Sequence, residues 1–250
     1  MSLQKASRFF LFISLSASAI CYLRRDAIET HHLEMALHPG FDAFGRNCLT
    51  LVPAAMAQTL LSILPIGAFS ILLALSLALL ASFRDERIRF GIRSALDTAS
   101  ALPGFLIAMA LGVVFPSSQM TAFLGATLLV VPSTTRFFES QILKLQMESH
   151  ITAAEAMGAR PIHIWIHHLF PALVDSALAL LPFILLRLIL IETSLSYLGL
   201  SVAPDHESWG RLLAQGKDYL MEAPWILASA AFPLFGVLTS FHLLSQDEQN

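Results

Sequence analysis

The feature that most constrains this sequence is a series of long apolar runs separated by short polar segments. Apolar residues make up 56% of the 250 residues and charged residues only 13%, whereas a soluble domain is about half apolar and about a quarter charged. The deficit is in charge, which a water-exposed surface needs, so lipid must be the solvent for much of the chain. A helical span needs about 20 apolar residues. The runs that approach this length are 9–23, 60–81, 95–115, 120–131, 172–191 and 224–244.

These runs predict an all-α integral membrane protein with about six transmembrane helices. We find no internal repeat or flexible linker, so residues 1–250 are expected to form a single membrane domain. The lipid bilayer is then the first partner of the chain. The net charge of −3 argues against a nucleic-acid-binding surface, which depends on many Lys and Arg side chains.

The first apolar run has two interpretations. Lys5 and Arg8 precede it, and the small residues at 17–19 resemble the cleavage site of a secretory signal peptide. A retained first span is favoured, because the apolar character continues past that site to Leu23. The sequence leaves both interpretations open.

Three other runs are irregular. Residues 49–59 are apolar but contain Pro53 and Gln58, and we expect them to lie along the membrane interface before the span at 60–81. The run at 95–115 contains Pro103-Gly104, which a membrane bundle tolerates when neighbouring helices bind the freed backbone groups. The run at 120–131 reaches the length of a span only if the helix continues through Pro132 to residue 138.

The distribution of Lys and Arg predicts the orientation. With six spans, both termini share one side of the membrane, and cytoplasmic loops are enriched in these residues. The expected terminal side has nine of them, and Arg187 lies inside a span. The nine are Lys5, Arg8, Arg84, Arg87, Arg89, Arg93, Arg136, Lys144 and Arg160; the five opposite are Arg24, Arg25, Arg46, Arg211 and Lys217. Cytoplasmic termini follow, and residues 150–170 then lie in a cytoplasmic loop.

That loop contains a semi-polar segment, TAAEAMGARPIHIWIHHLFP, at residues 152–171. Thr152 can cap a short helix that Gly158 would end. Pro161 suits the first turn of a second short helix, which would finish before Pro171. The small side chains of Ala153 and Ala154 would let another surface approach closely. A docking surface and an ordinary loop both fit these residues.

The segment resembles the EAA loop of ABC importer permeases. Ala153, Ala154 and Gly158 match its Glu-Ala-Ala, three residues, Gly pattern, with Thr152 in place of the glutamate. The resemblance implies that a coupling helix formed by this loop docks on an ATPase. The residues of the coupling helix that would contact the ATPase are Thr152, Ala153, Ala154, Met157, Gly158 and Pro161.

Further stretches resemble the dipeptide, oligopeptide and nickel branch of the same family. They are DAFGRNCLT at 42–50, IETSLSYLGLSV at 191–202 and ESWGRLLAQGKDYLMEAPW at 207–225. This resemblance implies an inner-membrane permease of the type I importer fold that moves peptides or nickel chelates. It implies as partners a second, non-identical permease, two cytoplasmic ATP-binding subunits and a soluble substrate-binding protein outside the membrane.

The chain itself has no phosphate-binding loop, because Gly216-Lys217 lacks the upstream glycine at the required spacing. We therefore expect no cofactor on this chain, no catalytic residue, and ATP with Mg²⁺ on the partner subunits. His163 and His167 are four residues apart, but Ile164 stands where a zinc-protease helix needs glutamate. We expect no metal site there.

Polar residues within the spans are candidates for a transport path. Arg187 lies deep in the fifth run and Glu192 at its outer end, and charges in membranes usually face the bundle interior or water. The alternatives are that Arg187 extends to lipid headgroups and that Glu192 only ends the helix. Trp209 and Trp225 are expected to be interfacial anchors.

Two other classes of function compete with a permease. A secondary transporter would respond to ion gradients, but the sequence has no inverted repeat with matching broken spans. A membrane-embedded enzyme would need a nucleophile with a base, or metal ligands, at membrane depth, and no such set is evident.

Overall fold

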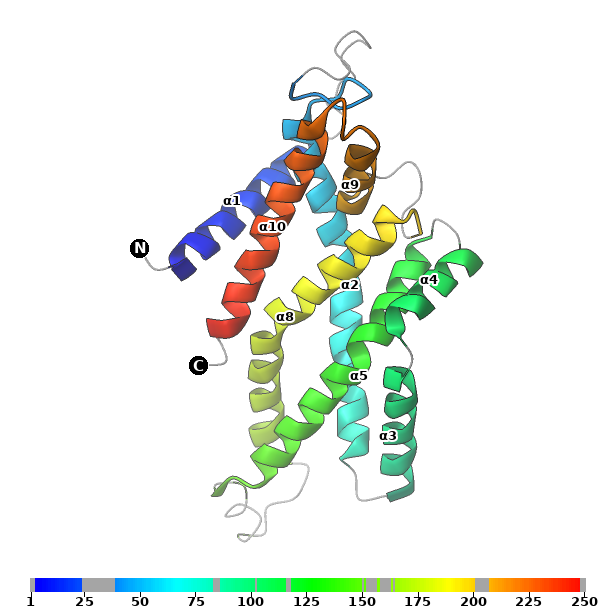
Figure 1. Ribbon diagram of the computed structural model, residues 1–250. Coiled ribbons are helices and arrows are strands. Elements are labelled where there is room, and N and C mark those ends of the chain that lie inside the picture. Colours follow the sequence, from blue (N-terminus) through cyan, green and yellow to red (C-terminus); the bar gives the residue numbers. More distant parts are fainter. Residues whose placement is uncertain are drawn as a thin grey trace.

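The computed structural model describes residues 3–23, 39–82, 86–101, 103–115, 118–149, 151, 157, 163, 165–200 and 207–247. Its elements are helices that cross one another in a tall bundle (Figure 1). They are α1 (Leu3–Leu23), α2 (Cys48–Ala81), α3 (Glu86–Ala101), α4 (Gly104–Val114), α5 (Gln119–Gln146), the π-helical turn η3 (Trp165–Leu169), α8 (Phe170–Tyr197), α9 (Trp209–Asp218) and α10 (Pro224–Asp247). The predicted all-α membrane fold is confirmed.

Helix α2 is the central element of the bundle and contacts α1, α3, α5, α8, α9 and α10. Asn47 caps its start, where the side chain accepts a hydrogen bond from the Leu49 backbone N–H at 2.9 Å. The expectation that residues 49–59 lie along the membrane interface is wrong, because they form the first turns of this single helix. Leu51, Ala55 and Thr59 are buried there, so neighbouring helices hold this segment in the bundle.

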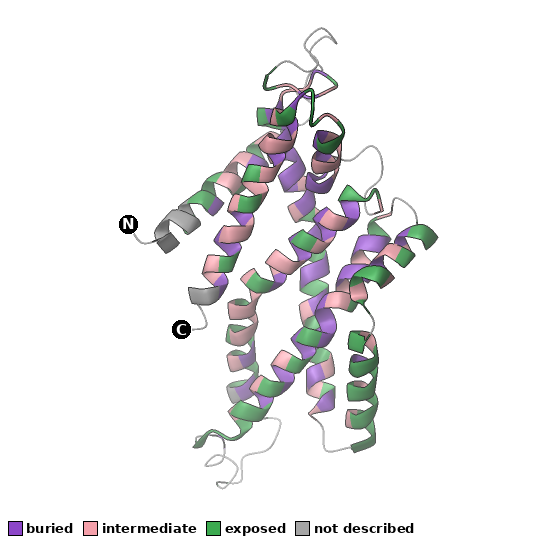
Figure 2. Ribbon diagram, viewed as in Figure 1, coloured by how far each residue is buried: buried purple, intermediate pink, exposed green. Residues whose placement is uncertain are grey.

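The third apolar run is a broken helix. The structure has α3 and α4 on either side of residues 102–103, and their axes are bent by 81°. Pro103 explains the break, since it lacks an N–H and disfavours helical geometry in the residue before it. Helix α3 also begins earlier than the apolar run, at Glu86, and only Leu96 on it is buried. Its exposed surface contrasts with the buried surfaces of α2 and α5 (Figure 2).

Helix α5 continues through Pro132 to Gln146 and is 28 residues long. The fourth apolar run could reach the length of a span only if the helix continued in this way. Close packing with α4 holds its upper half, because a side chain on Gly125 would come within 2.6 Å of the Ala108 Cβ. Small residues let membrane helices approach in this way. Ser118 caps the start of α5 by accepting from the Met120 N–H at 3.1 Å.

The C-terminal part of the chain also contains more helix than the sequence indicated. Helix α8 continues to Tyr197, past the predicted span end at 191, and the predicted outer loop contains α9. The second short helix was expected to finish before Pro171. Instead η3 runs without a gap into α8, and Pro171 occupies the first turn of α8.

Among the residues that the structure describes, four helices are long and apolar enough to cross a membrane, and the pair α3–α4 makes a fifth if it is one bent span. Helix α1 contains a shorter apolar helix, Phe10–Cys21, packed against α2 and α10. The chain is therefore a multi-pass membrane protein. The prediction of six spans is not confirmed by length and composition.

We predict that Gly125→Ala destabilises the fold, because the added methyl group would overlap Ala108. Overpacking of this kind costs about 1–3 kcal/mol. The measurement is the melting temperature of the purified protein in mild detergent. Gly91→Ala is the matched control, since nothing lies within 4 Å of that position. Equal melting temperatures for the two variants would contradict the proposed α4–α5 packing.

Candidate functional site

The two ends of the connection between α5 and α8 are packed together. Ile151 and Leu169 are buried, at 1% and 2% exposure, and share one hydrophobic cluster with Leu145 and Trp165. The described residues that flank the loop therefore lie together at the lower ends of α5 and α8 (Figure 1).

Most of the predicted docking residues fall outside the described part of this loop. They are Thr152, Ala153, Ala154, Gly158 and Pro161. Met157 lies in a turn and is 83% exposed. The rings of His163 and His167 stack with their centroids 4.2 Å apart.

Arg187 and Glu192, the two candidate path residues, are in different environments. The Arg187 guanidinium points across to α5, where Nη1 donates to Ser133 Oγ at 2.7 Å and Nη2 to the Leu129 carbonyl at 3.3 Å. It also lies 5.8 Å from the centre of the Phe183 ring. Glu192 is only 2% exposed and belongs to the packed interior near the upper end of α8. The structure does not bring the two side chains together as a pair.

Helix α9 is packed tightly into the upper end of the bundle. Trp209 is completely buried, its indole N–H donates to the Ala230 carbonyl at 2.9 Å, and its backbone N–H donates to Thr59 Oγ1 at 3.2 Å. At Gly210, an added Cβ would lie 2.1 Å from the Thr193 carbonyl oxygen. Only glycine permits this approach of α9 to α8.

The expectation of interfacial tryptophans is therefore wrong for Trp209, which is a core residue that ties α9 to α2 and α10. Trp225 is half-buried and donates its indole N–H to the Phe41 carbonyl at 3.1 Å. It thereby holds the segment before α2 against the start of α10.

Arg46 joins the segment before α2 to the segment before α9. Arg46 Nε donates to Asp42 Oδ2 at 2.7 Å, and Arg46 Nη1 donates to Glu207 Oε1 at 2.5 Å. Burial alone would lower the pKa of Arg46, but the hydrogen bonds and charges of Glu207 and Asp42 outweigh it and raise the pKa. The guanidinium therefore stays charged.

Asp42 is itself 1% exposed and accepts from the backbone N–H groups of Phe44 and Arg46, at 2.9 and 2.7 Å. The contact between these two segments was not predicted from the sequence. They are 161 positions apart, and no local pattern relates residues so distant.

Two further ion pairs join α3 to α5 in the lower half. Arg93 pairs with Glu139, and Arg136 Nη2 donates to Asp97 Oδ1 at 2.6 Å and to Ser100 Oγ at 3.3 Å. Because residues 93 and 97 are one turn apart on α3, both pairs form along one face of it. The charged residues of 86–101 were the sequence signal for these two ion pairs. We expected them to form a loop followed by a span, whereas they form the amphipathic helix α3.

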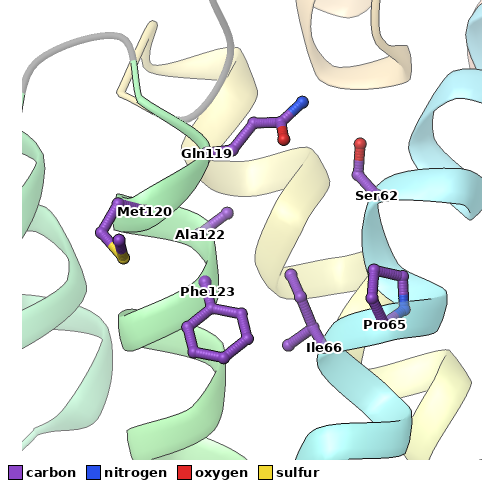
Figure 3. Close-up of a pocket in the computed structure, with 7 residues that line it drawn as sticks. All are labelled: Ser62, Pro65, Ile66, Gln119, Met120, Ala122 and Phe123. Carbon is purple, nitrogen blue, oxygen red and sulfur yellow. The ribbon is translucent and has the colours of Figure 1, made fainter.

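Cavities also occur between the helices. One of about 300 Å³ lies between α2 and the start of α5, and it is mainly apolar, with Ser62 and Gln119 as its polar members (Figure 3). A second, of about 460 Å³, lies between the start of α2 and α10.

We predict a favourable coupling between Arg46 and Glu207. Both side chains are mostly buried, at 16% and 25% exposure, so a double-mutant cycle with Arg46→Met and Glu207→Gln should give about 1 kcal/mol. The measurement is reversible unfolding in mild detergent. The control is Lys217–Asp218, which is 59% and 65% exposed and should give nearly zero. Equal coupling in the two pairs would refute the tie between the segments before α2 and α9.

Comparison with known proteins identifies the family. Residues 70–245 match the model for the binding-protein-dependent transport system inner membrane component. A putative peptide transport system permease protein of Brucella suis biovar 1 (strain 1330) is 28% identical over 188 residues, which is 75% of this chain and 63% of that protein. The chain thus spans less than two thirds of this relative's length.

Two other relatives are similar over a longer part of the chain. The dipeptide transport system permease protein of Alkalihalophilus pseudofirmus is 26% identical over 209 residues, 82% of this chain and 67% of that protein. The glutathione transport system permease protein of Pectobacterium atrosepticum is also 26% identical over 209 residues, 82% of this chain and 68% of that protein. The family match covers α3 to α10 and most of α2's second half, and the chain therefore belongs to the family of binding-protein-dependent transport system inner membrane components.

Proposed function

We propose that this chain is the permease subunit of an ATP-driven ABC importer in the bacterial inner membrane. The observation that carries the proposal is the family match over residues 70–245, on a bundle with four to five helices fit to span a membrane. Both termini are proposed to be cytoplasmic, on the basis of the Lys and Arg distribution.

The loop at 150–170 is proposed to be the coupling element. Thr152, Ala153, Ala154, Met157, Gly158 and Pro161 would contact one of two cytoplasmic ATP-binding subunits. Those subunits would bind ATP and Mg²⁺, and this chain would bind no cofactor. Support comes from the loop's attachment, since its buried ends at Ile151 and Leu169 adjoin α5 and α8. A push on the loop would therefore reach both helices directly.

The cargo is proposed to be a short peptide. The relatives' names specify peptide, dipeptide and glutathione transport, and glutathione is itself a tripeptide. This favours peptides over the nickel or metal chelates that the wider branch also carries. A soluble substrate-binding protein outside the membrane would deliver the cargo, and a second, non-identical permease would complete the path.

The proposed mechanism is alternating access. Closure of the ATPase subunits would move the coupling loop, and α5 and α8 would rock with it. Arg187 is proposed to line the path, while Glu192 is proposed to act at its outer end by fixing α8 within the bundle. The buried position of Glu192, at 2% exposure, favours this positioning role over contact with cargo.

We predict that Gly158→Trp abolishes uptake, because a bulky side chain would block close approach of the ATPase. The variant should still insert into the membrane, but the ATPase subunits should no longer co-purify with it. Gly91→Trp is the control for bulk, as it adds the same side chain at a position with nothing within 4 Å. Normal uptake by the Gly158 variant would argue strongly against a docking role for the loop.

A secondary transporter is the remaining alternative. It would move its cargo along an ion gradient without an ATPase. Uptake that survives deletion of the ATPase subunits and collapses when the ion gradient is removed would support this alternative.

A further inference from the structure

The lower half of α5 has one buried face and one exposed polar face. Along the exposed face lie Ser133, Arg136 and Ser140, at spacings that place them on one side of a helix. The opposite face is buried: Thr134, Thr135, Phe138, Glu139 and Ile142. We call Ser133, Arg136 and Ser140 the polar stripe.

The polar stripe is unsuited to lipid. Of the four long apolar helices found in the described residues, α5 is the least apolar. Polar side chains at membrane depth face the bundle interior or water rather than hydrocarbon. Asp97 and Ser100 of α3 bind Arg136 on the same side and extend this polar surface to a second helix.

Arg187 reaches the upper end of the polar stripe from α8. Its partner Ser133 is 14 residues from the start of α5 and 13 from its end, or about 20 Å from either end at the helical rise. The guanidinium is thus near the middle of the helix. The Arg187 side chain points across to α5 at this position instead of extending along α8 toward a helix end.

Arg187 also differs in its partners from three arginines that join helices or segments of the bundle. Arg46, Arg93 and Arg136 each pair with a carboxylate. In the described residues, the Arg187 guanidinium contacts a hydroxyl, a backbone carbonyl and an aromatic ring, and no carboxylate. A cation at membrane depth is costly without an anion, so this position favours an anionic ligand.

We infer that Arg187 and Ser133 form a mid-membrane site for the carboxylate of a passing peptide, with the polar stripe as its water-filled exit. The planar guanidinium fork matches the two oxygens of a carboxylate. This site specifies what Arg187 does in the path and therefore rests on the proposed permease function. A lipid phosphate also carries anionic oxygens and would fit the same site. The test below distinguishes a peptide carboxylate from a lipid phosphate.

The test is cysteine labelling in the complete importer in lipid nanodiscs. Ser133→Cys is introduced after replacement of the two native cysteines, Cys21 and Cys48, by serine. The thiol is treated with two methanethiosulfonate reagents, an anionic sulfonatoethyl and a cationic trimethylammonioethyl derivative. Each labelling rate is divided by the rate of the same reagent with a free thiol, which corrects for the intrinsic reactivity of the reagent. Leu128→Cys is the matched control, because Leu128 is 41% exposed on the other side of α5 at similar depth.

We expect both reagents to modify Ser133→Cys, with the anionic one favoured about tenfold, since a focused positive charge raises the encounter rate of anions. Adding Arg187→Gln should remove this preference, and Arg187→Lys should keep most of it. Leu128→Cys should not react. Dialanine should slow the labelling, whereas dialanine amide, which lacks the carboxylate, should not.

The inference would be overturned if Ser133→Cys were labelled no faster than Leu128→Cys in both the nucleotide-free and the vanadate-trapped importer. An anion preference that survives Arg187→Gln would also overturn it. If the thiol is protected only in nanodiscs of anionic lipid, a lipid phosphate and not cargo occupies the site. Ser140→Cys provides a second reporter on the same stripe should Ser133→Cys fold poorly.

These outcomes are separable from failure of the proposed function. Loss of the labelling pattern with ATP-dependent uptake intact would remove the carboxylate site and leave the permease. Uptake that requires no ATPase would remove the permease proposal, whatever the labelling shows.

Discussion

Lipid offers no hydrogen bonds, and the whole structure follows from that constraint. Backbone groups within the membrane must pair inside the protein, so the long apolar runs can only be helices. Where a proline prevents pairing, the helix breaks, as at Pro103, or continues inside protein, as at Pro132 in α5. Charges are subject to the same constraint. Arg93 and Arg136 pair with carboxylates between α3 and α5, and Arg46 pairs with Asp42 and Glu207 at the opposite end of the bundle.

The two ends of the bundle are held by different interactions. At the upper end of the bundle in Figure 1, Arg46 joins segments far apart in the sequence, and Trp209 and Gly210 fix α9 by hydrogen bonds and backbone contact. At the other end, the loop between α5 and α8 is attached through apolar contacts of Ile151 and Leu169. Apolar contacts are not directional, so they tolerate sliding better than a charged pair does. This difference suits the proposed permease, in which the loop at 150–170 would receive the motion and the opposite end of the bundle would hold its shape.

The sequence predicted the solvent, the helical class and the approximate position of most apolar runs, because these depend on local composition. It also indicated that α5 would pass through Pro132. It did not predict that residues 49–59 belong to α2 or that Trp209 is buried, since both depend on which helices pack against them. The pairing of Arg46 with Glu207 and of Arg187 with Ser133 was likewise out of reach, because each joins residues separated by more than 50 positions. Arg187 itself was found from its charge within an apolar run, and its partner was not.

The most direct test of the account is reconstitution of the chain in proteoliposomes, alone and with the partner permease, the two ATPase subunits and the loaded substrate-binding protein. The account predicts that a radiolabelled dipeptide accumulates only in vesicles that hold the complete assembly and ATP on the ATPase side. Accumulation by the chain alone, driven by an imposed ion gradient and indifferent to ATP, would contradict it.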